Sequence, residues 1–381
     1  MGAVSAVRLR WRAVSHLNPP FRADHVGSLL RPPAVLDARR ARAAGEITAD
    51  RQRAIEDVAI ADAIVGLEST GMQAITDGEF RRAWFHLDFL EQLDGVTVSG
   101  AIDASSDAAA TVGFTPPRLA VTGPLRHARP IQVDDYRFVA DHTGRTPKVC
   151  IPSPTMVHFR GGRAAIDIES YPDLEVFFSD LAEVYRQEIA QLYAAGCRYI
   201  QLDDTNLAYL CDPKMRAGAV ARGDNPDELP RTYAALINSV IDGRPADLTV
   251  GIHLCRGNFR STHFAAGGYE PVAEVLFNDL NVDAYFLEYD DDRSGDFSPL
   301  RFVPSNKTVV LGLVSSKFAE MESIESLARR VDQAAAFVAH DQLCLSPQCG
   351  FSSTVHGNQI SPEVQWDKLR LVVDAAARIW A

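Results

Sequence analysis

The sequence predicts an α/β protein built as a (βα)8 TIM barrel, and three observations lead to this fold. From Phe21 onward, short β-type runs alternate with amphipathic helical segments, which is the pattern of βα units on a parallel sheet. Eight such runs occur, the number that closes a barrel. Polar side chains that can bind metals or take part in catalysis follow these runs directly. In (βα)8 enzymes the active site lies at the carboxyl ends of the strands.

The expected strands follow one another along the whole chain. The first lies near 21–30 and contains His25 and Ser28. The second, 74–76, leads into a turn that carries Glu79. The other six are expected at 148–151, 199–204, 248–255, 284–288, 308–314 and 343–346.

Amphipathic helices separate these strands. Between Asp173 and Ala195, apolar residues recur every three or four positions, and Gly196 follows as the C′ residue. The last helix takes Ser361 as its N-cap and Pro362 at N1. The other expected helices lie near 48–69, 226–241, 271–277 and 324–335.

Two stretches depart from this alternation. Small polar residues and prolines interrupt the β-type runs between about 96 and 144, which predicts a hairpin-bearing insertion after the second βα unit. Residues 1–20 are rich in arginine and lack acids, so we expect a disordered N-terminal extension, with a transit peptide as the alternative. The remainder, 21–381, is expected to form a single catalytic barrel.

Composition excludes several classes of partner. The chain has 381 residues, 46% of them hydrophobic, and a net charge of −12. An acidic chain of this kind is a poor ligand for nucleic acid or for an anionic membrane, and no apolar run is long enough to span a bilayer. Six cysteines in this length are no disulfide scaffold, so a reducing, cytoplasmic environment is expected. The oligomeric state stays open, a homo-oligomer included.

A candidate metal site begins at the end of the fifth strand. His253 and Cys255 lie two residues apart, so both side chains leave a β-strand on the same face. One imidazole and one thiolate are half of a tetrahedral zinc site. Glu288 and Cys349 follow the sixth and eighth strands and can complete it. The alternative is a core histidine beside a buried free cysteine. Three further cysteines lie in apolar runs and are assigned to the core: Cys150, Cys197 and Cys344.

Several short segments, in this order, resemble one known family. They are His25-Val26-Gly27-Ser28, Asp77-Gly78-Glu79-Phe80, Gln201-Leu202-Asp203, His253-Leu254-Cys255, Leu287-Glu288 and Pro347-Gln348-Cys349-Gly350. Together they are similar to the catalytic barrel of cobalamin-independent methionine synthase, in its short single-barrel form. The resemblance covers nearly everything from Phe21 to the C-terminus.

This resemblance implies a reaction and assigns residues to it. His253, Cys255, Glu288 and Cys349 are implied to bind one zinc ion at which the thiol of homocysteine is activated. Ser28, Glu79 and Asp203 match positions that hold the carboxylate and ammonium groups of the amino acid, and His25 is grouped with them. The implied methyl donor is 5-methyltetrahydrofolate, often polyglutamylated, and the product is methionine.

The donor side of the site departs from the family pattern. The family has a histidine after the seventh strand, whereas this chain continues from Leu313 to Lys317 without one. The tryptophan-bearing segment after the third strand is also missing. Trp84 and Arg81 are assigned to the donor as replacements, although an aromatic residue at such a position often belongs to the core.

Three other functions stay open at this point. The zinc-bound thiol could accept its alkyl group from a methylcobalamin protein, another S-methyl compound or an epoxide. A sulfonate thiol would need a cationic clamp such as Arg22, Arg81 or Arg82. A barrel that stores or senses zinc would bind metal without catalysis. A decarboxylase of related fold would have no use for the two cysteines and the histidine together.

Overall fold

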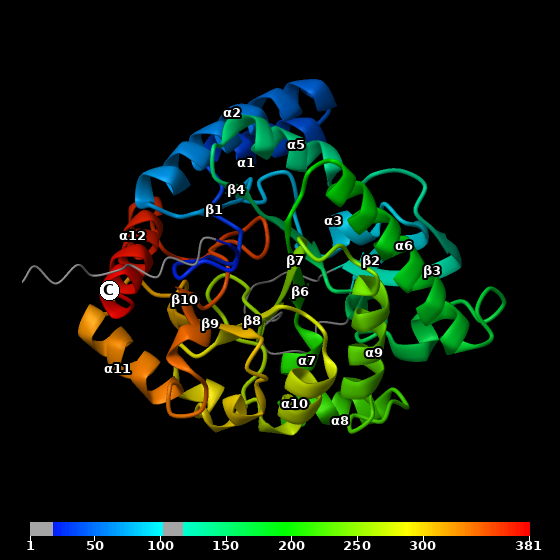
Figure 1. Ribbon diagram of the computed structural model, residues 1–381. Helices are drawn as coiled ribbons and strands as arrows, with labels where there is room; N and C mark the ends of the chain where they lie inside the picture. The colour runs from blue at the N-terminus through cyan, green and yellow to red at the C-terminus, as the bar shows by residue number, and fades with distance from the viewer. Residues whose placement is uncertain (1–17, 102–116) are drawn as a thin grey trace, which may run out of the picture.

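A parallel β-sheet forms the centre of the molecule in the computed structural model, which describes residues 18–101 and 117–381 (Figure 1). Six strands pair in the order β10–β9–β8–β7–β6–β5, and every neighbouring pair is parallel. The strands are β5 (Val149–Pro152), β6 (Tyr199–Asp204), β7 (Thr249–Leu254), β8 (Ala284–Glu288), β9 (Thr308–Val314) and β10 (Leu343–Pro347).

The first two predicted strands are shorter than the sequence suggested. Only Ala23 of the 21–30 stretch forms a β-bridge, with Leu345 of β10. The strand cannot extend to residue 30, because Gly27 adopts a φ of +130°, which does not belong to a β-strand. At the other edge, β1 (Ala74–Ile75) pairs in parallel with β4 (Thr146–Pro147), directly before β5.

The two edges of this sheet approach each other through side chains. In the described residues, no strand pairing joins the 21–24 segment to β1; the contact there runs from His25 Nε2 to the Ala74 carbonyl, at 3.0 Å. Lys148 Nζ lies inside the sheet, 3.1 Å from Asp24 Oδ1 and 2.6 Å from the His25 carbonyl. The predicted α/β class is confirmed, whereas backbone pairing does not show a fully closed eight-stranded barrel.

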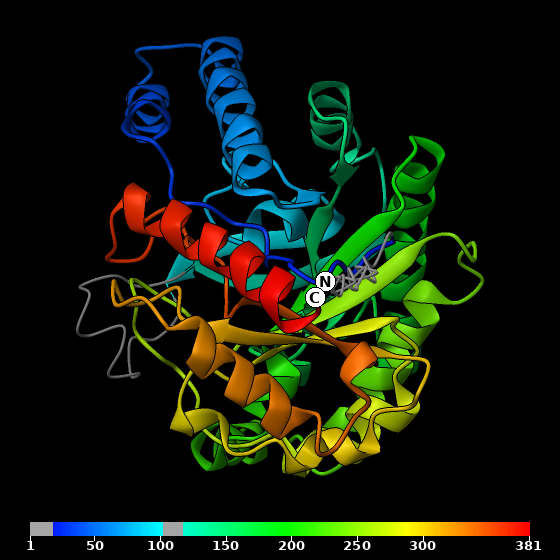
Figure 2. The same ribbon diagram turned by 60° about the vertical axis from the view of Figure 1, so that its left-hand side comes forward.

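Helices surround the sheet on its outer face (Figures 1 and 2). The predicted Ser361 cap is present, and Thr48 and Asp173 also cap their helices: each of the three side chains accepts a hydrogen bond from the first turn of its helix. The long helices are α1 (Pro33–Ala43), α2 (Ala49–Thr70), α5 (Val133–His142), α6 (Leu174–Ala194), α8 (Pro213–Ala221), α9 (Leu229–Ile241), α11 (Ile324–Ala334) and α12 (Pro362–Ile379). The short ones are α3 (Leu87–Leu90), α7 (Asn206–Tyr209) and α10 (Glu270–Glu274), which a π-helical turn (Val275–Asp279) extends.

Two apolar clusters hold these layers together. The larger one lies between the sheet and the helices and includes residues from nearly every element. The smaller one lies inside the curved sheet. Its members come from both edges and from the strands between them: Phe21, Ala74, Tyr199, Ala284, Phe286, Val310 and Cys344. An interior core built from alternating residues of successive strands is the packing expected of a barrel.

A two-stranded antiparallel sheet lies in the range for which an insertion was predicted. It consists of β2 (Asp94–Ala101) and β3 (Pro117–Arg126). The helix α5, which follows it, was not predicted, because the nearby prolines suggested an interrupted segment; Pro130 in fact precedes the helix. The polar stretch 105–111 and most of the predicted extension 1–20 lie outside the described residues. In the described part of the chain, none of the helices has the length and apolar character needed to cross a membrane.

Candidate metal and amino-acid site

Four potential metal ligands meet at the carboxyl end of the sheet. His253 is the next-to-last residue of β7, and Cys255 directly follows that strand. Glu288 is the last residue of β8, and Cys349 lies two residues beyond β10. One ligand atom from each side chain lies within 4.8 Å of the other three. All four residues are buried. The end of the sheet therefore brings together the imidazole, two sulfurs and carboxylate that the sequence singled out.

Backbone groups orient these side chains. Arg256 N donates to Glu288 Oε1 at 3.1 Å, and Gly257 N donates to Cys255 Sγ at 3.3 Å. The sulfurs of Cys255 and Cys349 are 3.5 Å apart. Cys349 comes this close because Gly312 of β9 has no side chain: a Cβ there would lie 2.7 Å from Gln348 Cα.

Hydrogen bonds and charges within the cluster shift the pKa values of its side chains. The hydrogen bond between the two sulfurs holds the pKa of Cys349 well below its usual range and raises that of Cys255. Burial disfavours a charged His253, but the Cys349 sulfur and the Asp203 and Glu288 carboxylates outweigh it and raise the histidine pKa. The negative charge shared by the two sulfurs is therefore favoured on Cys349.

These residues fit a divalent metal ion. Neither ring nitrogen of His253 nor Glu288 Oε2 has a hydrogen-bond partner of good geometry, although all three atoms are buried. A buried polar atom without a partner costs free energy, and a metal ion would satisfy all three at once. One nitrogen, two sulfurs and one carboxylate oxygen form a donor set that suits zinc.

A second polar cluster adjoins the metal ligands. Glu79, Cys150 and Asp203 each place a ligand atom within 4.8 Å of the others. Asp203 of β6 pairs in register with His253 of β7, so their side chains leave neighbouring strands on the same face. Glu79 has a φ of 57° and is held in this left-handed conformation by a hydrogen bond from its N–H to Asp77 Oδ1, at 2.7 Å.

The two carboxylates of this cluster resist ionisation. Burial, followed by the charge of Glu79, raises the pKa of Asp203 to about 7. Burial also raises the pKa of Glu79, against the ion pair that its carboxylate forms with Arg82. A cation placed between the two carboxylates would favour the ionised form of both. The cluster is therefore suited to an ammonium group.

The other two predicted amino-acid residues lie in the same chain segment but have different contacts. Ser28 packs against the loop that carries Cys349, since its Oγ accepts from Ser352 N at 3.3 Å and its carbonyl accepts from Phe351 N at 2.9 Å. A Cβ on Gly350 would lie 2.0 Å from Ser28 Oγ, so the hydroxyl lies against the residue that follows Cys349. His25 contacts the β1 backbone, and burial lowers its pKa to about 4.

Aromatic side chains from three loops meet at the same end of the sheet. Trp84 and Phe259 are stacked with ring centroids 6.2 Å apart and an interplanar angle of 18°. His356 lies 5.1 Å from the Phe259 ring and 6.5 Å from the Trp84 ring. Trp84 was predicted as a donor platform, whereas Phe259 was not singled out. The three rings come from loops after β1, β7 and β10.

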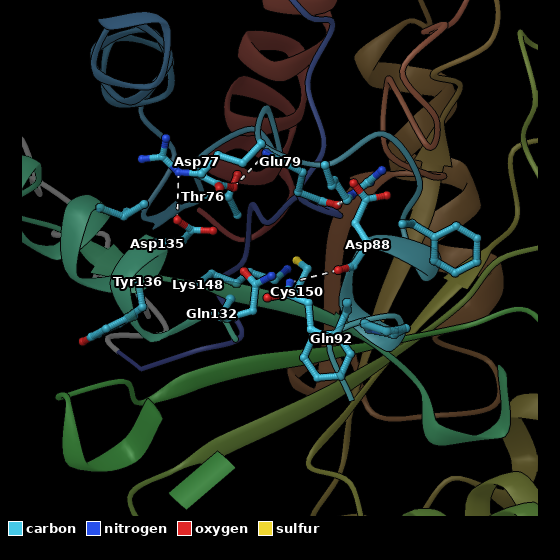
Figure 3. Close-up of a pocket in the computed structure, with 17 residues that line it drawn as sticks. Thr76, Asp77, Glu79, Asp88, Gln92, Gln132, Asp135, Tyr136, Lys148 and Cys150 are labelled. Carbon is cyan, nitrogen blue, oxygen red and sulfur yellow. Dashed lines mark hydrogen bonds and ion pairs between the residues drawn. The ribbon is translucent and has the colours of Figure 1, made fainter. Parts of the chain in front are cut away.

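Arg81 forms ion pairs, whereas Trp84 stacks on Phe259. Its guanidinium binds Asp57 at 2.8 Å and Asp135 at 2.9 Å, next to α2 and α5. It lines a pocket that also includes Glu79, Cys150 and Gln132 (Figure 3). The pocket offers about 90 Å³, far below the roughly 300–1,000 Å³ typical of sites for folate-sized ligands. The structure therefore does not bring the two predicted donor residues together.

Three residues of this region were not predicted from the sequence. Cys150 was assigned to the core, but its sulfur lies with the Glu79 and Asp203 carboxylates. The alternation of β5 could have revealed this, because Lys148, two residues earlier, also points to the interior. Phe259 and Lys317 lie in loops after β7 and β9, where no periodic pattern identifies a side chain's direction. By contrast, Cys197, Cys211 and Cys344 are buried and unbonded to other cysteines.

Comparison with known proteins places the chain in a family. Residues 21–378 match the family described as cobalamin-independent synthase, catalytic domain. The chain is 48% identical over 363 residues to the uncharacterized protein YxjH of Bacillus subtilis, with 95% of each protein covered. It is 25% identical over 328 residues to the methionine synthase of Pyrococcus horikoshii, with 85% of this chain and 84% of that protein covered.

A solved structure agrees with this match. A Listeria monocytogenes protein provisionally named a vitamin-B12 independent methionine synthase superposes with a TM-score of 0.75 at 37% identity, over 96% of this chain and 99% of the other. The chain therefore belongs to the family of cobalamin-independent synthase catalytic domains, as its motifs predicted, and it is a methyltransferase of that cobalamin-independent type.

Proposed function

We propose that this protein is a zinc-dependent S-methyltransferase that transfers the methyl group of 5-methyltetrahydrofolate to the thiol of homocysteine and forms methionine. One observation carries the proposal: ligand atoms of His253, Cys255, Glu288 and Cys349 lie within 4.8 Å of one another beside a buried carboxylate pair. Metal ligands alone would suit many enzymes. Their combination with an ammonium site favours an amino-acid thiol.

The amino-acid end of the substrate is recognised by three side chains. Glu79 and Asp203 hold the ammonium group, whose charge lets both buried carboxylates ionise. Ser28, which packs against the Cys349 loop, offers its hydroxyl to the carboxylate group. This orientation directs the thiol side chain from the acid pair toward the metal ligands.

The reactive sulfur is prepared within a buried site. When bound, zinc would supply the positive charge that keeps the homocysteine sulfur deprotonated at neutral pH. Arg256 N–H fixes the Glu288 carboxylate, and Gly257 N–H fixes the Cys255 sulfur, so the ligand set is oriented before substrate enters. Burial of all four ligands excludes water, so the sulfur is not shielded by hydrogen bonds from solvent.

For the donor, the stacked Trp84–Phe259 pair is the surface on which we place the flat pterin ring. A second candidate function is a thiol alkyltransferase of the same family that uses another donor. That donor would be a methylcobalamin protein, another S-methyl compound or an epoxide. Two observations support it. Arg81 is bound to Asp57 and Asp135, and the loop after β9 carries Lys317 where a histidine would handle the leaving-group proton.

The experiment is methionine formation by zinc-loaded protein supplied with homocysteine and with mono- or polyglutamylated 5-methyltetrahydrofolate. Turnover that Cys255→Ser abolishes, and that Cys197→Ala retains, supports the full proposal; Cys197 is buried at the opposite end of β6. No turnover with folate, but methylation of homocysteine by methylcobalamin, supports the second candidate. Purified protein that binds neither zinc nor homocysteine contradicts both.

A further inference from the structure

Lys317 is a buried cation without a partner. Its side chain is 1% exposed, and Nζ makes no hydrogen bond or ion pair with any residue that the structure describes. Lysine is almost never fully buried unless it is paired, because its charge loses the stabilisation that water provides. The position of Lys317 therefore requires a compensating negative charge nearby.

The backbone around Lys317 is fixed to the loop that carries Cys349. Ser316 N donates to Gln348 Oε1 at 3.0 Å, and the Ser316 hydroxyl lies 2.7 Å from that oxygen and 3.2 Å from the Gly350 carbonyl. Asn358 Nδ2 donates to the Ser316 carbonyl at 2.8 Å. These contacts attach the residue before Lys317 to both neighbours of Cys349, so Lys317 is held beside the metal ligands.

The charged groups around Lys317 come from three loops. The Lys317 ammonium interacts electrostatically with the Cys349 and Cys255 sulfurs. Burial, followed by the charge of Lys317, lowers the pKa of His263 to about 4. Lys317 also interacts electrostatically with the Asp290 carboxylate, in the loop after β8. The ammonium thus acts on the ends of β7, β8 and β10 at once.

We propose that Lys317 is a specificity-determining residue that favours a thiolate substrate over its thioether product. The inference rests on the proposed function. Two cysteinates and one glutamate around a divalent ion leave one net negative charge, and a homocysteine thiolate makes it two. The thioether of methionine adds no charge. A fixed ammonium beside this site therefore attracts homocysteine more than methionine and assists release of the product.

The test compares the affinity of zinc-loaded protein for L-homocysteine and L-methionine by calorimetry. We expect Lys317→Met to weaken homocysteine binding about tenfold at neutral pH and to leave methionine binding nearly unchanged, because only the thiolate interacts with the lost charge. The midpoint of the pH profile for homocysteine binding should rise by about one unit. Lys317→Arg, which keeps the charge, should retain most of the preference.

Lys368→Met is the matched control. Lys368 is also buried, but it pairs with Glu322, which in turn accepts from Ser315 N. Its loss disturbs the same loop without removing the charge beside the metal ligands, so both ligands should be affected alike. Equal effects of Lys317→Met on both ligands, or no effect, would overturn the inference. If Lys317→Met does not fold, Lys317→Gln against Lys317→Arg gives the same comparison. Wild-type protein that binds no zinc or no homocysteine contradicts the proposed function instead.

Discussion

Glu79 combines an unfavourable backbone conformation with an unfavourable charge. A non-glycine residue at a φ of 57° is uncommon, and such conformations persist where the surrounding structure enforces them. Asp77 enforces this one from the same turn, and Arg31 Nη2 donates to the Glu79 carbonyl at 2.7 Å. The turn directs the carboxylate at Asp203, where burial raises the pKa of both acids and the charge of Glu79 raises that of Asp203 further. This arrangement disfavours the empty site and favours one that holds an ammonium group.

The first prediction concerns Glu79→Gln. In the wild-type protein, methionine affinity should increase as the pH rises through about 7, because Asp203 must ionise to bind the ammonium group. The variant removes the neighbouring charge, so the midpoint should move to lower pH while the maximal affinity falls about tenfold. Methionine is used because its sulfur does not titrate. Glu91→Gln, at an exposed position after α3, should leave the profile unchanged. An unshifted midpoint in Glu79→Gln contradicts the pairing of the two acids.

The second prediction concerns stability without ligand. The pKa of Asp203 rises from 3.8 to about 7 on folding, so the native state keeps a proton that the unfolded chain has released. The free energy of unfolding should therefore decrease as the pH rises from about 4 to about 7. Asp203→Asn should remove much of this decrease, which urea titrations at several pH values would measure. A variant with the same pH dependence as the wild type would show that Asp203 ionises freely.

At the scale of elements, the junction of β9 and β10 controls the metal ligands. Gly312 of β9 lies against Gln348, and a Cβ at this position would meet Gln348 Cα at 2.7 Å and the Leu287 carbonyl at 2.9 Å. Both contacts are with backbone, which cannot move aside as a flexible side chain can. The small residue thus permits the loop after β10 to bring Cys349 to Cys255.

The third prediction is that Gly312→Ala separates these strand ends. We expect a loss of about 1–3 kcal/mol in the free energy of unfolding, as for other overpacked sites, together with weaker zinc binding. Gly144→Ala is the control, since a Cβ there meets nothing within 4 Å. Denaturation curves and metal titrations of the two variants make the comparison. Zinc affinity equal to that of the wild type would mean that the loop adapts.

The sequence predicts elements better where side-chain periodicity is strong. The six strands from β5 to β10 and the helices α2, α6, α9, α11 and α12 lie within a few residues of their predicted positions, because each has a continuous apolar run or an amphipathic face. The helices α1, α5 and α8 were not predicted. The first strand was overestimated since Val26, Leu29 and Leu30 are apolar, yet Gly27 between them has a φ of +130° that does not belong to a strand. The four candidate metal ligands could be singled out because each lies at or just after the end of a strand, whereas Cys150 was assigned to the core although it shares the inward face of β5 with Lys148. Phe259 and Lys317 depend on loop conformations that periodicity does not encode.

At the scale of the molecule, one buried ion pair joins the two edges of the sheet. Lys148 and Asp24 are both fully buried, and the lysine ammonium also lies 4.2 Å from the centre of the Phe286 ring. Asp24 accepts further hydrogen bonds from Tyr199 Oη at 2.8 Å and from His25 N. These contacts lie where β1 and the 21–24 segment lack backbone pairing, so polar side chains close the interior there.

The fourth prediction follows from this ion pair. Lys148→Met should cost about 3–5 kcal/mol of unfolding free energy, because it leaves the Asp24 carboxylate buried without its counter-charge. The double variant Lys148→Met, Asp24→Asn should lose less than the single one, since no isolated charge remains. Urea denaturation of the four proteins measures the coupling energy. Additive losses would show that the two charges do not interact.

A metal ion bound by the candidate ligands would also cross-link three strands of the sheet. Cys255 and Cys349 are 94 positions apart in the sequence, and Glu288 lies between them on a third strand. An ion held by all of them would tie β7, β8 and β10 as a chemical bridge does, and because every ligand is buried it could leave only when these strand ends separate. Loss of metal to a chelator should then proceed at a rate set by this opening and independent of chelator concentration. Retention of the ion would be a property of the rigidity of the sheet as well as of the affinity of its ligands.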